Sequence, residues 1–467
     1  MTEIKQYTIE HRGAHAGVLE DPERDVDRVL SGITAHRASA LVHELEARVA
    51  SGALRPGQPL PSVRRLAARI GLSPATVAAA LSELRRRGVV VTEPRRGTHI
   101  GERPPLEAWP RALAVPPGAR DLSLGNPDPA LLPDPQAALA RLAMPKRLYG
   151  EPPELPELIM AAREQLRADG IPAEDVCVVG GALDGIERVL QAHLRPGDRV
   201  AVEDPGYAPL YDLLRADGLG LQPVGIDARG MVPGSLRAAL RAGAGAVVVT
   251  PRGQNPTGAT LDHERAEALR AVLAEHPQAL LLEDDHLGPV AGAPMHSLAA
   301  ASGRWASARS VAKSLGPDLR LALLAGDAGT IARVRGRQSC GPGWISHLIQ
   351  RLVLAMWSDP DVQRLVERAA GCYAERRERL LADLHSRGVP AQGDSGLNVW
   401  VSCDEEAALL GALSGRGWVL APGARYRLES SAPAVRVTCA TLDGADSARL
   451  ASDIAELLAT RRPSRAG

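Results

Sequence analysis

The feature that most constrains the fold is a repeated alternation of short apolar segments with helical patterns, which begins near residue 121. The apolar segments occupy residues 176–179, 199–203, 246–250, 279–283, 305–311 and 321–326. Strands that are apolar on both faces are typical of a mostly parallel sheet covered by helices on both sides. We therefore predict an α/β domain over 121–467, with a smaller α+β portion from about residue 375.

Residues 34–101 show a different pattern, in which three short helices precede two strands. Ser62 and Ser73 each stand directly before a helical segment, at the N-cap position that serine favours. Strands are expected at 89–92 and 98–100, on either side of a charged turn. This order predicts a winged helix-turn-helix, whose third helix enters the major groove of DNA.

The two patterns are separated by a stretch that contains five prolines and shows no periodicity. The expected organisation is an N-terminal tail (1–33), a winged helix-turn-helix domain (34–101), a linker (102–120) and a large domain (121–467).

Positive charge is concentrated in the predicted winged helix. Residues 34–100 hold eleven arginines against four glutamates, with no lysine or aspartate, in a chain whose net charge is zero. A basic block joined to an acidic remainder indicates contact with nucleic acid. No apolar run is long enough to span a membrane. Five scattered cysteines without metal or disulfide spacing indicate reduced thiols, hence a cytoplasmic protein.

The segment LRPGQPLPSVRRLAARIGLSPATVAAALSELRRRG, which begins at Leu54, resembles the DNA-binding domain of GntR-type bacterial regulators. The resemblance implies double-stranded DNA as a partner, with contacts from Arg64, Ser73, Thr76, Arg95 and Arg96. The last two would lie on the wing. Pro74 departs from the family, which often has arginine at this position, so one base-reading donor is missing.

Lysine is rare in this chain, which contains only Lys5, Lys146 and Lys313. Lys313 precedes a Gly-Pro turn, and Arg320 follows seven residues later. An amine can deprotonate and attack a carbonyl, whereas a guanidinium cannot. This segment is therefore a candidate for covalent chemistry, and a surface lysine before a turn is the alternative.

Other candidate groups follow the predicted strands, at the edge where open α/β sheets bind ligands. A Gly-Gly-Ala sequence at 180–182 opens a helix, so its amides could hold a phosphate. Tyr207 follows a strand in a chain with only 3% aromatic residues, and Asn255 lies in a tight turn. Residues 283–286 end a buried strand with three acids and a histidine, which is costly unless a cation pairs with one of them.

Together these segments resemble the fold-type I pyridoxal-phosphate enzymes of the aspartate aminotransferase superfamily. The motifs stand in the order YG at 149–150, GGALDG, EDPGY, TPRGQNPTG, EDDH, SVAKSLGPDLR and RVT at 436–438. The match extends from about residue 121 to 460. With the winged helix in front, the chain is identified as a member of the MocR subfamily of GntR-type regulators, in which an aminotransferase-like domain is the effector domain.

The resemblance implies a role for each residue around pyridoxal 5'-phosphate. Lys313 would form an imine with the cofactor aldehyde, and Asp284 would pair with the pyridinium nitrogen. Tyr207 would stack on the ring. Asn255 would donate to the ring 3-oxygen, and His286, which stands where the family usually has tyrosine, could donate there too.

The same resemblance places the phosphate and the effector. The phosphate would be held by Ser310, Arg320 and the amides of Gly181 and Ala182. Tyr149 would reach the phosphate of the neighbouring subunit, since members of this fold are dimers with shared sites. Arg436 would bind the carboxylate of an amino-acid effector.

Some positions leave alternatives open. His286 titrates near neutrality in its unperturbed form, so the protonation of the imine could differ from the family's. Ala312 stands where serine is common and removes a possible phosphate partner. A metal site at 284–286 is a rival, but adjacent residues at a strand end point in alternate directions and no second histidine pair is present, so no metal is expected. Tyr207 could instead fill the core, and Arg436 could be a charge on a strand face.

The leading hypothesis is a dimeric transcriptional regulator that binds DNA and senses pyridoxal phosphate or an amine that reacts with it. An aminotransferase with a fused basic domain is the second hypothesis, and the basic domain argues against it because transamination needs no contact with DNA. A regulator that has lost the cofactor and keeps the fold for dimerisation is the third.

Overall fold

The computed structural model describes residues 30, 32–50, 53–86, 89–93, 97–101, 115–429 and 432–460. Contacts within the chain divide it into two units, Met1–Pro105 and Leu106–Gly467. Most of the tail and most of the linker lie outside the described residues, so the four-part organisation expected from the sequence remains a proposal.

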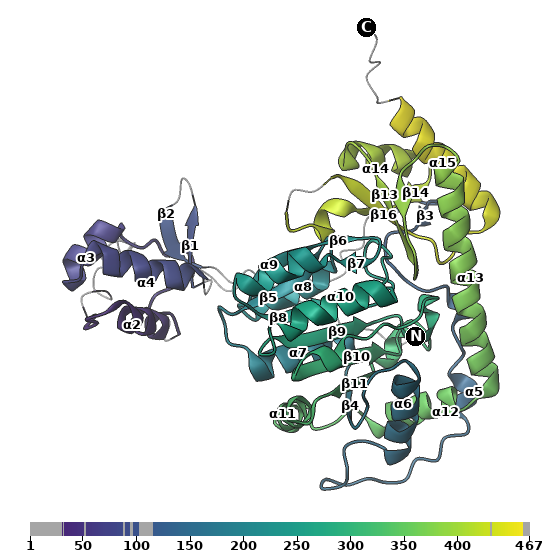
Figure 1. Ribbon diagram of the computed structural model, residues 1–467, viewed down its shortest axis with the longest axis horizontal. Coiled ribbons are helices and arrows are strands. Elements are labelled where there is room, and N and C mark those ends of the chain that lie inside the picture. Colours follow the sequence, from purple (N-terminus) through teal and green to yellow (C-terminus); the bar gives the residue numbers. More distant parts are fainter. Residues whose placement is uncertain are drawn as a thin grey trace, which may run out of the picture. The chain divides into compact units, whose positions relative to one another are not determined.

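The first unit has the three helices and the wing expected from the sequence. They are α2 (Ala38–Ala50), α3 (Val63–Ile70), α4 (Pro74–Arg86) and the antiparallel strands β1 (Val90–Glu93) and β2 (Gly97–Ile100) (Figure 1). Side chains from all five elements share one core, in which Leu45, Leu66 and Leu84 are buried. Gly71 ends α3 with φ 71°, a left-handed conformation that glycine adopts at little cost, and so permits the tight turn into α4.

The second unit is built on an eight-stranded sheet in the order β4-β11-β10-β9-β8-β5-β6-β7. The strands are β4 (Asp175–Val179), β5 (Arg199–Asp204), β6 (Gly220–Asp227), β7 (Gly230–Met231), β8 (Ala244–Val249), β9 (Leu280–Asp285), β10 (Arg304–Ser310) and β11 (Ala322–Gly326). The neighbours β6, β5, β8, β9 and β10 run parallel, whereas β11 is antiparallel to both β10 and β4. The sheet is therefore mostly parallel, as the sequence predicted.

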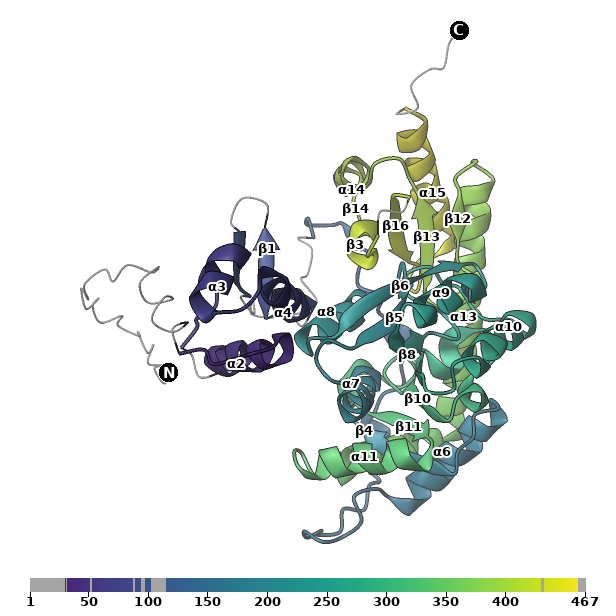
Figure 2. The same ribbon diagram turned by 60° about the vertical axis from the view of Figure 1, so that its left-hand side comes forward.

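Helices cover both faces of this sheet (Figures 1 and 2). One face packs against α6 (Pro156–Ala168), α9 (Pro233–Arg241), α10 (His263–Ala274) and α12 (His347–Trp357). The other packs against α7 (Ala182–His193), α8 (Ala208–Ala216) and α11 (Ala328–Ser339). Residues of each strand alternate between the two cores: Val176 and Val178 join one, and Cys177 and Val179 the other. This alternation explains why the strands are apolar throughout.

A smaller sheet in the order β12-β13-β16-β15 forms the C-terminal part of the unit. Its elements are α13 (Pro360–His385), β12 (Ala391–Gln392), β13 (Asn398–Ser402), α14 (Glu406–Gly415), β14 (Trp418–Val419), β15 (Ala421–Pro422), β16 (Ala434–Thr438) and α15 (Gly444–Ala459). This part corresponds to the smaller α+β portion that the sequence predicts from about residue 375. A short helix, α5 (Gln136–Leu139), precedes the large sheet in the chain.

The first strand of the second unit pairs with a strand near the C-terminal end of the same unit. Strand β3 (Arg120–Asp121) pairs in parallel with β14, and the side chain of Leu122 is buried in the core of the smaller sheet. The chain thus reaches the small sheet before it enters the large one. In the described part of the chain no helix is both long and apolar enough to cross a membrane.

Candidate functional site

The predicted site residues converge at the carboxyl ends of the parallel strands. Tyr207 follows β5, Asn255 follows β8, Asp284 lies at the end of β9 and Lys313 follows β10. Because these strands are neighbours and run in the same direction, their ends meet at one edge of the sheet. The site therefore assembles residues from four separate strand–loop connections.

Lys313 is half-buried, and its Nζ donates a hydrogen bond to the carbonyl oxygen of Gly125 at 2.7 Å. Burial, followed by the positive charge of Arg436, lowers the pKa of Lys313 to about 8. A substantial fraction of this amine is therefore neutral near physiological pH, as a nucleophile requires.

Asp284 is buried, with 5% of its surface exposed, and its Oδ1 atom has no hydrogen-bond partner in the protein. Burial, followed by the charge of Asp285, raises the pKa of Asp284 to about 7. A buried carboxylate oxygen that no protein donor satisfies is costly. The position therefore fits a cationic or N–H donor that comes from a ligand.

Tyr207 and His286 are both close to these groups. Burial raises the pKa of Tyr207 to about 12, with Asp284 as a second cause, so its hydroxyl stays protonated. Burial, followed by the charge of Lys313, lowers the pKa of His286 to about 4. The expectation that His286 titrates near neutrality is thus wrong for this environment, and its imidazole is neutral at physiological pH.

A cradle suited to an anion lies at the start of α7. Gly181 has φ 120°, and a Cβ atom placed on it would lie 2.8 Å from Nη2 of Arg320. The same nitrogen donates to the carbonyl oxygen of Gly180 at 3.3 Å. Arg320 itself has φ 43°, the single positive value for a non-glycine residue in the described chain. A residue held in a conformation that costs free energy at a ligand-binding edge is consistent with a functional role.

The remaining candidates for binding a phosphate are the amide of Ala182, next to Gly181, and the hydroxyl of Ser310, at the end of β10. Gly181 is the N-cap of α7 and has no side-chain capping bond, so the first amides of the helix, including that of Ala182, are available to an anion. Ser310 is buried at the end of β10, where its hydroxyl accepts a hydrogen bond from the amide of Ala312 at 3.1 Å. That hydroxyl can still donate to an anion.

Arg436 is a buried guanidinium on β16, with 3% of its surface exposed. Its Nη1 donates to Oδ1 of Asn255 at 2.9 Å, and its Nη2 donates to the carbonyl oxygen of Ser123. The Arg436 guanidinium lies 5.1 Å from the ring centre of Tyr426. The amide oxygen of Asn255 is thus engaged, and its NH₂ group remains the atom that can donate to a ligand.

Two features of this site were not foreseen from the sequence. The first is segment 122–125, whose carbonyl groups accept hydrogen bonds from Lys313 and Arg436. The second is a buried arginine–aspartate cluster behind Asp284, formed by Asp169, Arg252, Asp285 and Arg309. Alternation along β9 could have shown that Asp285 points away from Asp284. Its partners are Arg309 on the neighbouring strand β10, Arg252 after β8 and Asp169 at the end of α6, and none of them has a signal next to Asp285 in the sequence.

In the arginine–aspartate cluster, Asp285 is fully buried and both of its oxygens are taken. Arg252 Nε donates to Oδ1 at 2.9 Å, and Arg309 Nε donates to Oδ2 at 2.7 Å. Asp169 Oδ2 accepts from the Nη2 atoms of both arginines, at 3.0 and 2.6 Å. Although burial alone would raise it, these arginine charges hold the pKa of Asp285 well below its usual range. Asp285 is therefore committed to arginines, which disfavours a metal site at 284–286.

Tyr149 and the predicted DNA contacts that the structure describes lie at the surface. Tyr149 is 92% exposed and packs edge-on against Trp344, with ring centres 5.5 Å apart. Arg64 is exposed on α3. At the start of α4 the Ser73 hydroxyl accepts from the Thr76 amide at 3.1 Å and lies 2.8 Å from the Thr76 hydroxyl. Arg95 and Arg96 lie outside the described residues.

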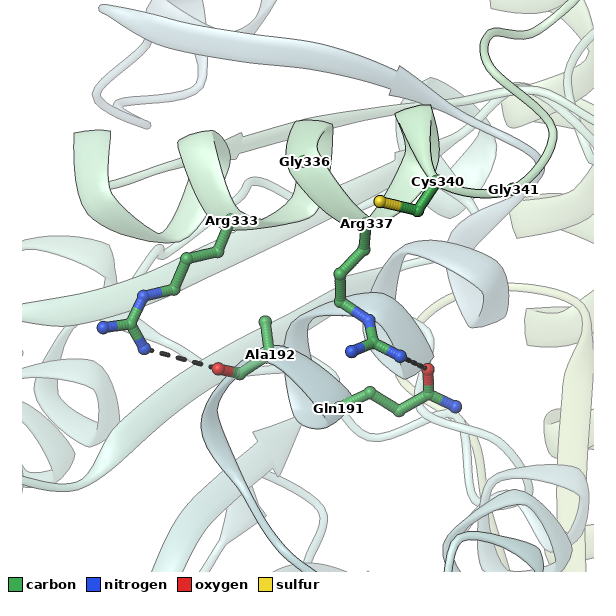
Figure 3. A pocket seen from close by; sticks show the side chains of 7 residues that line it. All are labelled: Gln191, Ala192, Arg333, Gly336, Arg337, Cys340 and Gly341. Carbon is green, nitrogen blue, oxygen red and sulfur yellow. Dashed lines mark hydrogen bonds between the residues drawn. The ribbon is translucent and has the colours of Figure 1, made fainter.

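A separate hollow lies between α7 and α11 (Figure 3). It is lined by Gln191, Ala192, Arg333, Gly336, Arg337, Cys340 and Gly341. Arg337 Nη2 donates to Oε1 of Gln191 at 2.6 Å, and Arg333 Nη1 donates to the carbonyl oxygen of Ala192 at 3.3 Å. This hollow is at the C-terminal end of α7, about 15 Å along the helix from Gly181. It is not part of the candidate site.

Both parts of the chain match known families. Residues 121–454 match the model for aminotransferase class I and II, and residues 37–100 match the model for bacterial regulatory proteins of the gntR family. An archaeal alanine:glyoxylate aminotransferase superposes with a TM-score of 0.66 at 20% identity, over 74% of this chain and 91% of that one. A mutant of Thermus thermophilus aspartate aminotransferase superposes with a TM-score of 0.64 at 24% identity, over 74% and 100%. These structures share the fold of the second unit.

Fold and family matches together define a DNA-binding transcriptional regulator with an aminotransferase-like domain. Among its relatives, the vitamin B6 salvage pathway transcriptional repressor PtsJ of Salmonella typhimurium is 38% identical over 91% of this chain and 99% of its own length. The HTH-type transcriptional regulator TauR of Rhodobacter capsulatus is 31% identical over 78% and 82%. The chain belongs to the MocR-type regulators, in which a GntR-family domain is fused to an aminotransferase class I and II domain.

Proposed function

We propose that the second unit binds pyridoxal 5'-phosphate and that the protein uses this site to regulate transcription. When bound, this cofactor supplies an aldehyde that reacts with amines and a ring that stabilises negative charge. The main support is that one site contains both Lys313, whose pKa is lowered, and Asp284, whose buried Oδ1 atom has no hydrogen-bond partner in the protein. Burial disfavours the charged form of each group, and each would have a partner in the cofactor.

The other residues fit the remaining parts of the cofactor. The open amides at Gly181 and Ala182, with Arg320 beside them, match a phosphate group. The free NH₂ group of Asn255 and the neutral imidazole of His286 are donors suited to a ring oxygen. Tyr207 offers an aromatic face. Arg436 would hold the carboxylate of an effector amino acid.

The pH dependence of cofactor attachment is the first prediction. Because Lys313 attacks as the neutral amine and its pKa is lowered to about 8, attachment should accelerate roughly fivefold between pH 7 and pH 8 and level off above about pH 9. The measurement is the rate at which the visible absorption band grows after mixing with pyridoxal phosphate. A tenfold rise per pH unit that continues beyond pH 9 would mean an ordinary lysine pKa and contradict the buried-amine argument.

DNA binding is the second part of the proposal and rests on the exposed arginines of the first unit. Arg64→Ala should weaken binding to the protein's own upstream region roughly tenfold, because an exposed arginine at the start of α3 can reach a phosphate or a guanine edge. Gel-shift titration at fixed salt measures this loss. Arg37→Ala, which removes an exposed arginine before α2, is the matched control and should change affinity much less. Equal losses would indicate only a general charge effect.

A homodimer is the third part. The exposed large apolar side chains of the second unit include Leu139, Met144, Leu148, Tyr149, Met160 and Leu348. They lie on or next to α5, α6 and α12, and α12 packs against both of the other helices. An apolar surface of this kind marks an interaction site. Sedimentation should give twice the chain mass of 49.2 kDa, and a monomer at micromolar concentration would contradict the proposal.

We propose further that the site senses pyridoxal phosphate or an amine that reacts with it, with genes of vitamin B6 or amine metabolism as targets. The relative named as a vitamin B6 salvage repressor supports this direction. The deciding experiment is the gel shift repeated with and without pyridoxal phosphate. Unchanged DNA affinity would reject sensing.

Sustained production of a 2-oxo acid from two substrates would instead favour the aminotransferase alternative. The cytoplasmic location remains a prediction.

A further inference from the structure

Segment 122–125 crosses the candidate site and is held by its two cations. Lys313 Nζ donates to the Gly125 carbonyl oxygen at 2.7 Å, and Arg436 Nη2 donates to the Ser123 carbonyl oxygen. Gly125 has φ 67°, and a Cβ atom there would lie 3.4 Å from both terminal nitrogens of Arg436. Glycine therefore allows the backbone to approach the guanidinium this closely.

The same segment is anchored on its other side to β14 and to strand β16 of the small sheet. The Leu122 amide donates to the Val419 carbonyl at 2.8 Å, and the Thr438 amide donates to the Leu122 carbonyl at 2.9 Å. The Gly125 amide donates to the Thr438 hydroxyl at 3.0 Å. The position of the segment thus depends on the small sheet together with Lys313 and Arg436.

The segment is also the first part of the effector domain after the linker. Strand β3 is Arg120–Asp121, so the linker (102–120) continues directly into the segment. A change at Ser123 or Gly125 is therefore only a few residues from the chain that joins the two units. No other described segment at the site has this covalent continuity with the linker.

We propose that segment 122–125 reports occupancy of the site to the linker. The inference rests on the proposed cofactor and effector site. When Lys313 is attached to the aldehyde, its nitrogen forms a C=N bond, the aldehyde oxygen leaves as water, and at most one of its N–H donors remains. When Arg436 holds a carboxylate, its donors turn to that group. In both events a backbone carbonyl of the segment loses its partner, and the segment is released from the site.

Amide hydrogen exchange of the full-length protein tests this release. With pyridoxal phosphate as the probe, exchange across 122–126 should accelerate roughly ten- to a hundredfold, the effect of losing one hydrogen bond to a charged group. Peptides from α2 and α10 should not change and serve as internal references. Visible absorption recorded on the same sample shows whether the cofactor is attached. Attachment without faster exchange in the segment overturns the inference.

Two substitutions of one residue separate the inference from cofactor binding. Lys313→Ala removes the donor to Gly125, so the segment should exchange faster even without cofactor, and DNA affinity should shift to the value of the cofactor-bound wild type. Lys313→Arg keeps a donor and cannot attach the cofactor, so it should behave as the cofactor-free wild type. Identical exchange in the two variants overturns the inference. If the wild type never gains the absorption band, the proposed cofactor site fails, whereas this comparison still tests the segment.

A third variant guards against misfolding at position 313. Thr438→Val removes the acceptor of the Gly125 amide and leaves both cations in place. It should raise exchange of the segment without cofactor and reduce the change in DNA affinity that cofactor causes, while the absorption band is retained. An unchanged response of DNA affinity, with faster exchange, would show that the segment does not communicate with the DNA-binding unit and would also overturn the inference.

Discussion

Lys313→Ala is expected to abolish the visible absorption band that pyridoxal phosphate gives with the wild-type protein. The covalent bond requires a neutral amine at this position, and a methyl group cannot supply one. Affinity for the cofactor should fall by a hundredfold or more, about 2.7 kcal/mol, because the phosphate cradle and Asp284 alone remain to hold it. Absorption titration and equilibrium dialysis measure the two effects.

Lys146→Ala is the matched control, because Lys146 is exposed and far from Lys313 in sequence. It should leave both the band and the affinity unchanged. If Lys313→Ala kept the band, or if Lys146→Ala lost it, the assignment of the covalent lysine would be wrong. Loss of the band in neither variant would leave Lys5 as the remaining candidate lysine, and Lys5→Ala would then test it.

Asp285→Ala is expected to lower the free energy of unfolding by about 3–5 kcal/mol, the largest stability effect that we predict. The substitution leaves Arg252 and Arg309 buried with only Asp169 as a carboxylate partner. Since the pKa of Asp285 is held below its usual range, its contribution is fully present above about pH 4 and is lost only as the pH falls through the folded-state value. Urea denaturation at neutral pH measures the change.

Glu275→Ala provides the comparison for this stability measurement. Glu275 pairs with Arg237 at 2.9 Å on the surface, where solvent screens the charges, so its loss should change the unfolding midpoint little. A similar loss of unfolding free energy in both variants would show that the buried arginine–aspartate cluster stabilises the protein no more than a surface ion pair does. If Asp285→Ala were as stable as the wild type, water or a rotated Asp169 would have to accept the hydrogen bonds of the two arginines. The arginine–aspartate cluster would then not be essential for stability.

Much of the candidate site was predictable because its chemistry is local. Lys313 stood out in a chain with three lysines, and the order of the motifs identified the aminotransferase-like domain. Ser62 caps α3, as expected of a serine at that position. Asp284 and Asp285 had to face opposite sides of the sheet because residues alternate along a strand. Each of these predictions needed only a few neighbouring residues.

Other properties depended on atoms that are distant in the sequence. His286 is neutral because burial and the charge of Lys313 act on it together, which no inspection of EDDH could show. The antiparallel direction of β11 depends on how the turn around Arg320 folds back beside β10. Arg309 meets Asp285 because β10 pairs with β9 and brings the two residues into register, and Arg252 joins them from the connection after β8.

By itself, the sequence determined the class of the protein and its α/β fold with an N-terminal winged helix-turn-helix, and it supplied the candidate residues for a cofactor site. The tertiary structure decided what state those residues are in. Lys313 and Arg436 are more than 100 positions apart, yet both bond segment 122–125, which lies some 190 and 310 positions before them. Hydrogen bonds and desolvation act over a few ångströms in space. Only folding brings such groups within that range and sets their pKa values and partners.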